Sequence, residues 1–182
     1  MARRLLAKVA AHMAGLPPFD GQSFAGTLRA DWRANRDDGR SLVIVMLFRF
    51  AQAASAQRSW LKLFALPVLV LYKLVVEWLF TVDLPVRTRV GPGLTLDHAY
   101  GVVIHPDSVI GSRCRLIQGV TIGQRNVPGE APTIGDDVQF GANAVALGAI
   151  HIGDGARIGA GAVVVHDVPA GATAVGVPAR IL

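Results

Sequence analysis

Large apolar residues recur every six positions through the second half of the chain. From Ile104 onward nearly every residue at this spacing is large and apolar, apart from one skipped step after Ile122. The positions are Ile104, Ile110, Leu116, Ile122, Ile134, Phe140, Ala146, Ile152, Ile158 and Val164. The fourth residue after each position is small or aliphatic, as Cys114 and Val138 are. Because six is not a multiple of the 3.6 residues in a helical turn, this period argues against an α-helix.

A six-residue repeat of this kind predicts a parallel β-helix. Each hexapeptide forms one face of a triangular coil, its large apolar residue points inward, and each coil buries the core of the next. Glycine directly follows many of these positions, where it tolerates the turn at a corner. These glycines are at 111, 123, 135, 141, 153 and 159.

The repeat is irregular at two places. Val90 and Leu96 begin the same rhythm two residues out of phase with Ile104. The segment "GQRNVPGEAPT", residues 123–133, breaks the pattern, which resumes in phase at Ile134. We therefore expect an extended loop over 123–133 that leaves the coils intact, and loops on rigid scaffolds often carry function.

Residues 1–82 have a helical pattern and form the first of two expected regions, the second being the β-helix over 83–182. Residues 1–19 predict an amphipathic helix rather than a secretory signal, because Lys8 and His12 interrupt the apolar run. Further helices are expected before residue 36, after a cap at Ser41, and from Ser59 to Phe80 with a kink or a start near Pro67. The helix from Ser59 to Phe80 carries too many charges to span a membrane. It is therefore expected either to pack on the core or to lie in the interface of a membrane.

Composition narrows the set of partners. The chain has 182 residues, a formal net charge of +5, a sequence pI of about 10.1 and one cysteine. A basic chain favours anionic partners such as CoA phosphates, lipid head groups or diphosphate-linked substrates. Nucleic acid is not expected, because the arginines are scattered and no aromatic–basic alternation occurs. A single cysteine is compatible with a reducing, cytoplasmic location.

Several motifs resemble those of the hexapeptide acyltransferases, and in particular the serine acetyltransferase branch. They are "LTLDHAYGVVI", "GVTIG", "IGDDVQFGANAVALGAIHIGDGARIGAGAVV" and "AVGVPARIL", and the likeness extends over about 83–182. The resemblance implies a mainly β fold, a left-handed parallel β-helix with an N-terminal α-helical region. It also implies a homotrimer, with a pair of trimers left open, and acetyl-CoA bound as co-substrate between adjacent prisms.

The resemblance also implies roles for individual residues. His98 matches the catalytic base and Asp83 the carboxylate paired with it, while Asp97 and Asp31 match acceptor-binding acids. An imidazole with a pKa near the working pH suits proton removal from a hydroxyl. The residues expected to bind the acyl donor are Gly123, Gln124, Arg125, Ala142, Ala160 and Arg180. Of these, Gly123 or Gln124 would offer a backbone N–H to the developing oxyanion.

One departure bears on the acceptor. Serine acetyltransferases carry an Arg-His pair before a proline late in the extended loop, where this chain has Glu130-Ala131-Pro132. An amino-acid acceptor would lose its counter-charge there. The chain therefore resembles the branch that acetylates sugar hydroxyls in exopolysaccharide or related glycan assembly. A lipid-linked acceptor at the cytoplasmic face of the membrane would suit the basic, apolar helical region.

The sequence also allows other interpretations of these residues and of the function. Asp97 could be a turn residue and His98 a surface histidine. The enzyme could acetylate serine, or the prism could be a non-catalytic scaffold. His105 is expected at a corner, His151 and His166 at the surface, and Cys114 as an inert core residue. No metal site is expected, because no second histidine or cysteine lies at ligand spacing.

Overall fold

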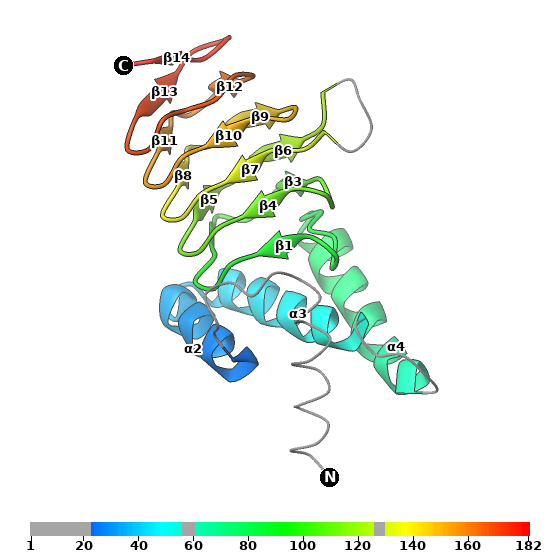
Figure 1. Cartoon of the computed structure of the whole chain (residues 1–182). Helices are drawn as coiled ribbons and strands as arrows, with labels where there is room; N and C mark the ends of the chain where they lie inside the picture. Colours follow the sequence, from blue (N-terminus) through cyan, green and yellow to red (C-terminus); the bar gives the residue numbers. More distant parts are fainter. Residues whose placement is uncertain (1–22, 56–60, 126–129) are drawn as a thin grey trace.

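The structure, a computed structural model, describes residues 23–55, 61–125 and 130–182, without the side chains of 61–64. The predicted amphipathic helix over 1–19 lies outside these residues. In the described part, a β-solenoid stands on a layer of helices (Figure 1). The predicted parallel β-helix with N-terminal helices is therefore confirmed.

The solenoid has three faces, each a sheet of short strands from successive coils. The β1 face contains β1 (Arg89–Val90), β4 (Val109–Ile110), β7 (Thr133–Ile134) and β10 (His151–Ile152). The β2 face contains β2 (Thr95–Asp97), β5 (Arg115–Ile117), β8 (Gln139–Phe140), β11 (Arg157–Ile158), β13 (Thr173–Val175) and β14 (Arg180–Ile181). The β3 face contains β3 (Val103–Ile104), β6 (Thr121–Gly123), β9 (Val145–Leu147) and β12 (Val163–Val164).

The six-residue pattern determines which side chains fill the solenoid. All ten apolar positions of the repeat are buried, and so are the residues four places after each of them except Ile122, including Ser108 and Cys114. Coils stack in parallel register, so that Leu96 pairs with Leu116 and Leu116 with Phe140. Burial of Ile122 and Ile134 on either side of the break shows that the core continues past the loop. The predicted hexapeptide core is therefore confirmed position by position.

Two of the three corners between the faces carry most of the candidate site residues. The histidine corner joins the β2 face to the β3 face and comprises residues 98–102, 118–120, 141–144 and 159–162. The loop corner joins the β3 face to the β1 face and comprises residues 84–88, 105–108, 124–125, 130–132, 148–150 and 165–167.

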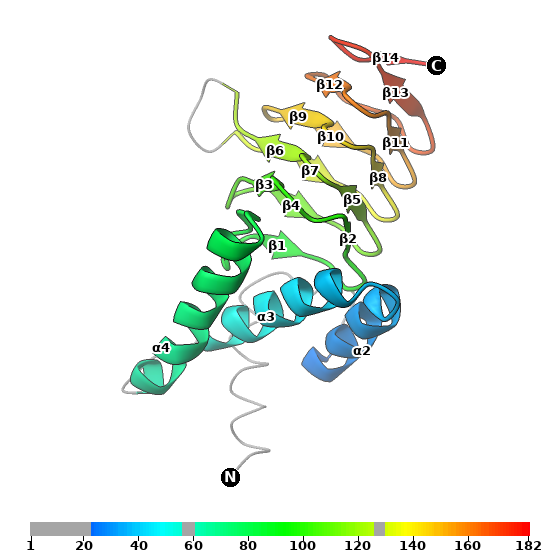
Figure 2. The ribbon, with the colours of Figure 1, turned by 180° about the vertical axis from the view of Figure 1, so that it is seen from behind.

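The helices close the first end of the solenoid (Figure 2). They are α2 (Phe24–Asn35), α3 (Gly39–Ser55), α4 (Leu61–Tyr72) and the π-helical η1 (Lys73–Leu79), which continues α4. Asn35 ties α2 to the first coil, because its Nδ2 donates a hydrogen bond of 2.8 Å to the Leu94 carbonyl. Pro67 lies inside α4 rather than at its start.

The cap of α3 differs from the expected one. Asp38 Oδ1 accepts hydrogen bonds from the backbone N–H groups of Arg40 and Ser41, at 2.9 and 3.3 Å. The Ser41 side chain instead donates to Asn35 Oδ1 and accepts from the Leu96 N–H at 3.0 Å. The prediction of Ser41 as the cap was wrong, because its hydroxyl forms hydrogen bonds at the junction between the helices and the solenoid.

The other end of the solenoid is closed by the chain terminus. β14 reverses direction and pairs antiparallel with β13, with Val175 opposite Arg180. The N–H of Ala179 donates to the Val163 carbonyl at 2.8 Å, and that of Leu182 to the Thr173 carbonyl at 2.9 Å. The last ten residues thus fold over the final coil.

Candidate active site

The phase slip in the repeat is located at the histidine corner of the first coil. Five residues, 98–102, separate β2 from β3, whereas three residues, 118–120, separate β5 from β6 in the next coil. The longer corner begins at His98, which is exposed and has a φ of 51°. A positive φ at a residue other than glycine is uncommon and often marks a functional position.

Asp83 lies at the same corner. Its backbone pairs with β3, because its N–H donates to the Val102 carbonyl and its carbonyl accepts from the Ile104 N–H, both at 2.8 Å. Asp83 is exposed between buried Val82 and Leu84, so its carboxylate points out of the prism. Among the described residues no hydrogen bond joins the side chains of His98 and Asp83. The base and acid pairing remains a prediction.

Asp97 forms an ion pair with a residue of the next coil. Its Oδ2 accepts from the guanidinium of Arg115 on β5, and its side chain is only 18% exposed. Arg115 therefore compensates the charge of Asp97 and fixes its orientation beside His98. The second carboxylate oxygen remains available, so an acceptor-binding role for Asp97 also stays a prediction.

Asp31 does not have the role expected from the sequence. Its side chain is fully buried, its Oδ2 accepts from Arg49 Nε at 2.7 Å, and its Oδ1 accepts from the Gly93 N–H at 2.6 Å. Arg49 in turn donates to the carbonyls of Val90 and Gly91, at 2.8 and 2.6 Å. With both oxygens engaged inside the protein, Asp31 joins the helices to the first coil and cannot reach an acceptor.

The residues expected to bind acetyl-CoA fall at two different corners. Ala142 and Ala160 lie at the histidine corner, two and three coils above His98. Gly123 ends β6 next to the loop corner, and exposed Gln124 and Arg125 follow it there. Within one chain these two sets are therefore on different edges of the prism.

A hollow of about 320 Å³ lies at the loop corner. It is lined by Arg125, Glu130, Leu147, Gly148, Ala149, Ile150 and Val165. Ala131 and Pro132 follow Glu130, so the described part of the loop offers Arg125 as the cation at this hollow. Arg180 lies apart from it, exposed on β14 at the far end of the β2 face.

Sequence reasoning missed three residues at the histidine corner. The guanidinium carbon of Arg40 lies 4.2 Å from the ring centroid of Tyr100. In the coil above, Gln118 Oε1 is buried and accepts no hydrogen bond from a described residue. The two-residue slip before Ile104 could have pointed to Tyr100, whereas nothing in the pattern of α3 distinguishes Arg40.

The remaining titratable candidates are structural. His105 lies at the loop corner, where its Nδ1 accepts from the Asp107 N–H at 3.3 Å. Cys114 is fully buried, its Sγ donates to the Gly135 carbonyl at 3.1 Å, and burial raises the pKa of its thiol to about 12. The predictions of a corner histidine and a core cysteine are confirmed. Among the described residues no three His, Cys, Asp or Glu side chains gather as they would around a metal ion.

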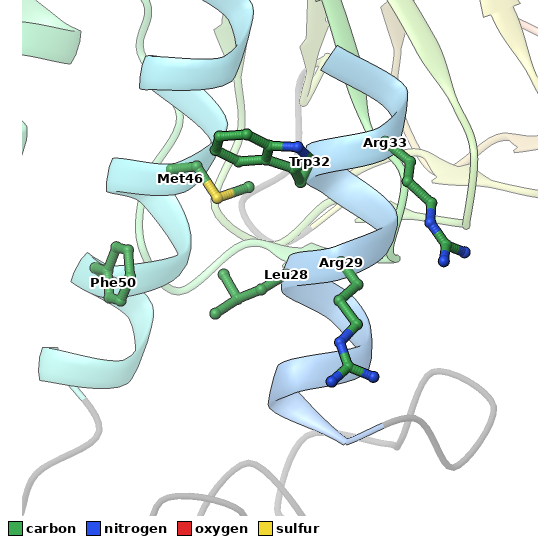
Figure 3. A pocket seen from close by; sticks show the side chains of 6 residues that line it. All are labelled: Leu28, Arg29, Trp32, Arg33, Met46 and Phe50. Atoms are coloured by element: carbon green, nitrogen blue, oxygen red, sulfur yellow. The ribbon is translucent and has the colours of Figure 1, made fainter. Parts of the chain in front are cut away.

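A larger hollow, about 470 Å³, lies outside the solenoid between α2 and α3. Figure 3 shows Leu28 and Trp32 of α2 facing Met46 and Phe50 of α3, while Arg29 and Arg33 of α2 also line the hollow. No residue of a coil lines this groove, so it is not part of the site at the histidine corner.

Comparison with known proteins agrees with this architecture. The family described as bacterial transferase hexapeptide (six repeats) matches residues 131–166. WcaB of Escherichia coli strain K12, whose name assigns it to acetyl transfer in colanic acid biosynthesis, is 37% identical over 155 residues. That match covers 83% of this chain and 96% of WcaB. The chain belongs to the hexapeptide-repeat acyltransferases.

Solved structures in this family have the same fold. The soybean serine acetyltransferase apoenzyme superposes with a TM-score of 0.75 at 35% identity, covering 88% of this chain and 69% of that one. A serine acetyltransferase in complex with CoA superposes with a TM-score of 0.72 at 28% identity, covering 98% and 82%. This hexapeptide-repeat protein is thus an enzyme of the acetyltransferase class, with relatives that differ in their acceptors.

Proposed function

We propose that the protein transfers acetyl from acetyl-CoA to a sugar hydroxyl during exopolysaccharide or other glycan biosynthesis. The observation that carries this choice is the match to WcaB over nearly the whole length of that protein. The sequence Glu130-Ala131-Pro132 supports it, because this part of the loop offers no cation to an amino-acid carboxylate.

The chemistry assigned to the site is direct transfer. The acceptor hydroxyl oxygen attacks the thioester carbonyl carbon as His98 removes the hydroxyl proton. The C–S bond then breaks, and the CoA thiolate takes that proton from the imidazolium. General-base assistance of this kind contributes about 10²–10⁴-fold to a rate. Asp83 would hold the imidazole in one tautomer and stabilise its cationic form, once rotation of the two exposed side chains brings them together.

The proposal also requires more than one subunit. His98 with Ala142 and Ala160 lies at one edge of the prism, and Gly123 with Arg125 at another. In a closed ring of three copies, the histidine corner of one prism can face the loop corner of the next. Acetyl-CoA would then lie between two prisms, with a backbone N–H at Gly123 or Gln124 directed at the oxyanion.

Serine acetylation is the second candidate, because the solved relatives named above are serine acetyltransferases. The test measures CoA release with glycan fragments from the host's own polysaccharide and with free L-serine. We expect turnover with a glycan and none with serine. Robust turnover of serine alone would overturn the proposed acceptor, and no CoA release with any acceptor would favour a scaffold.

We place the enzyme in the cytoplasm, with peripheral contact at the inner face of the membrane. None of the described helices is long and apolar enough to span a bilayer. One side of α4 and η1 nevertheless exposes Leu66, Val70, Leu74 and Trp78, the last by 71%. An exposed apolar side ending in tryptophan suits the interface of a membrane. Flotation with anionic vesicles tests this, and a Trp78→Ser variant should float less.

A further inference from the structure

Arg40 is held over an aromatic surface beside the candidate base. Its guanidinium carbon lies 4.2 Å from the centroid of the Tyr100 ring and 5.7 Å from that of Phe80. A guanidinium over an aromatic ring is attracted by the ring and restricted in orientation, while its N–H donors point outward from its edge. Arg40 is therefore a cation with a fixed position.

The same aromatic surface is built into the histidine corner. The Tyr100 N–H donates to the His98 carbonyl at 2.7 Å, and the Gly101 N–H donates to the Thr81 carbonyl at 3.1 Å. The start of α3, the end of η1 and the first coil therefore converge within a few residues of His98. Because Tyr100 is two residues from His98, a molecule that contacts both Arg40 and Tyr100 would bind at the histidine corner.

No described carboxylate forms an ion pair with Arg40. Asp37 pairs with Arg36 at 3.6 Å, and Asp38 is used by the backbone cap of α3. By contrast, the buried Arg49 and the exposed Arg113 both have aspartate partners. A guanidinium with five donors that forms no ion pair with a described carboxylate is suited to bind a carboxylate or phosphate from outside.

Tyr100 also suits a carbohydrate. It is 47% exposed although Arg40 covers part of its ring, so an aromatic surface remains for the C–H groups of a sugar. The Gly119 N–H of the next coil donates to the Tyr100 carbonyl at 2.8 Å, which fixes the backbone that carries this ring.

We propose that Arg40 and Tyr100 form an acceptor subsite that selects a sugar bearing a negative charge, which Arg40 binds while the ring packs on Tyr100. This inference rests on the proposed function, since it names the class of sugar acceptor. The charge can be a uronate carboxylate on the ring or a phosphate at the anomeric position, and these share the chemistry that a guanidinium recognises. Arg40 and Tyr100 are specificity residues here, distinct from the residues that transfer the proton.

The test compares three probes that differ in charge. They are a disaccharide ending in glucuronic acid, the matching neutral disaccharide ending in glucose, and glucose 1-phosphate. Dissociation constants are measured by calorimetry or NMR titration with the wild-type protein and with Arg40→Gln. We expect an anionic probe to bind about 10- to 100-fold more tightly than the neutral one, as a charge-assisted bond gives. Whichever anionic probe binds more tightly identifies the source of the charge.

Variants separate recognition from structure. Arg40→Gln should abolish the preference for the anionic probe, Arg40→Lys should retain part of it, and Tyr100→Ala should weaken all sugar probes. Arg157→Gln is the matched control, because Arg157 is an exposed arginine on β11 of the β2 face, outside both corners. Wild-type protein without a preference for charge, or Arg40→Gln that weakens charged and neutral probes equally, overturns the proposal.

Binding is measured apart from turnover so that the two proposals fail separately. If serine is acetylated and no glycan is, the proposed function fails. A charge preference that disappears in Arg40→Gln would still establish the anionic subsite. If a neutral glycan is acetylated well and anionic probes do not bind, the proposed function stands and the subsite is refuted.

Discussion

Arg49 Nε donates a hydrogen bond of 2.7 Å to Oδ2 of Asp31, and both side chains are almost wholly buried between the helices and the first coil. The pair also binds the backbone of the coil through Gly93, Val90 and Gly91. It is the charged one among several polar contacts between the two layers, which also include those of Asn35 and Ser41 with the first coil. The fold depends on it because either partner alone would be a buried, uncompensated charge.

Asp31→Asn should therefore destabilise the protein. Removing one partner of a buried pair costs about 3–5 kcal/mol, which urea unfolding measures directly. Asp37→Asn is the control, because the Asp37 side chain is 94% exposed and the change should stay within about 0.5 kcal/mol. If Asp31→Asn kept wild-type stability and instead raised KM for the acceptor, the earlier acceptor-binding interpretation would be restored.

His98→Asn tests the base while sparing the backbone. Asparagine tolerates the positive φ at this position better than alanine does, so folding should be retained. We expect kcat to fall about 10²–10⁴-fold with little change in melting temperature or in particle size by light scattering. His166→Asn, at an exposed histidine, should leave kcat unchanged. Normal turnover in His98→Asn would remove the histidine from the mechanism.

Gly123→Leu tests whether acetyl-CoA lies along the loop corner of a neighbouring prism. A Cβ at Gly123 would meet only Leu147 Cδ2, at 3.6 Å, so the chain itself accommodates a side chain. The variant should keep its melting temperature, but its KM for acetyl-CoA should rise because the leucine occupies the proposed donor groove. An unchanged KM would place the donor elsewhere.

Mixing two impaired variants tests whether the site is shared between subunits, with acetyl-CoA held below the raised KM of Gly123→Leu. Oligomers reassembled from His98→Asn and Gly123→Leu chains should be more active than either parent, because some interfaces then combine an intact histidine corner with an intact loop corner. Each variant alone, treated in the same way, is the control. A mixture no more active than the average of its components would mean that one chain holds the whole site.

Gly119, at the histidine corner, has a matched control in Gly155, which lies at a different corner, between β10 and β11. Both have positive φ values, 70° and 67°, but a Cβ at Gly119 would lie 2.0 Å from Asn143 Oδ1, whereas one at Gly155 meets nothing. Gly155→Ala should cost about 1–2 kcal/mol from the backbone alone, and Gly119→Ala clearly more. Asn143→Gly in the Gly119→Ala background should recover the extra stability lost, because it removes the Asn143 side chain that the new Cβ meets. Equal losses of stability for the two alanine variants would show that the histidine corner accommodates the added Cβ without cost.

Cys114 should make the protein sensitive to alkali. Its thiol pKa is about 12 in the folded state because burial disfavours the thiolate, against about 8.5 in an unfolded chain. The stabilisation is fully present below about pH 8.5 and is lost as the pH rises toward the folded value, because the unfolded chain then binds fewer protons. Cys114→Ala should show a flatter decline in unfolding free energy above that pH.

Alkylation gives a second measure of the same burial. Cys114 is the single cysteine of the chain, so incorporation of iodoacetamide reports on it alone. The native protein should stay unmodified at pH 8, and the urea-unfolded protein should react fully. Rapid modification of the native protein would contradict the buried, protonated thiol.

The solenoid was predictable from the sequence because one six-residue rule governs Ile104 through Val164, interrupted only by the loop over 123–133. The helical layer was less predictable, since its polar contacts join residues that are distant in the chain. Asp31 resembled an acceptor-binding acid because local sequence cannot show that Arg49 lies beside it. The role of Arg40 was not predictable for the same reason, because its partner Tyr100 is sixty positions away in the sequence and belongs to the solenoid.

The antiparallel return of β14 over the last coil limits how copies of this protein can meet. A stack of identical coils with a bare end would offer a template on which the next molecule could continue the sheet, and such chains would grow into fibres. Here the terminus occupies that edge at one end and the helices occupy the other. Parallel continuation of the coils from one molecule into the next is therefore disfavoured at both ends.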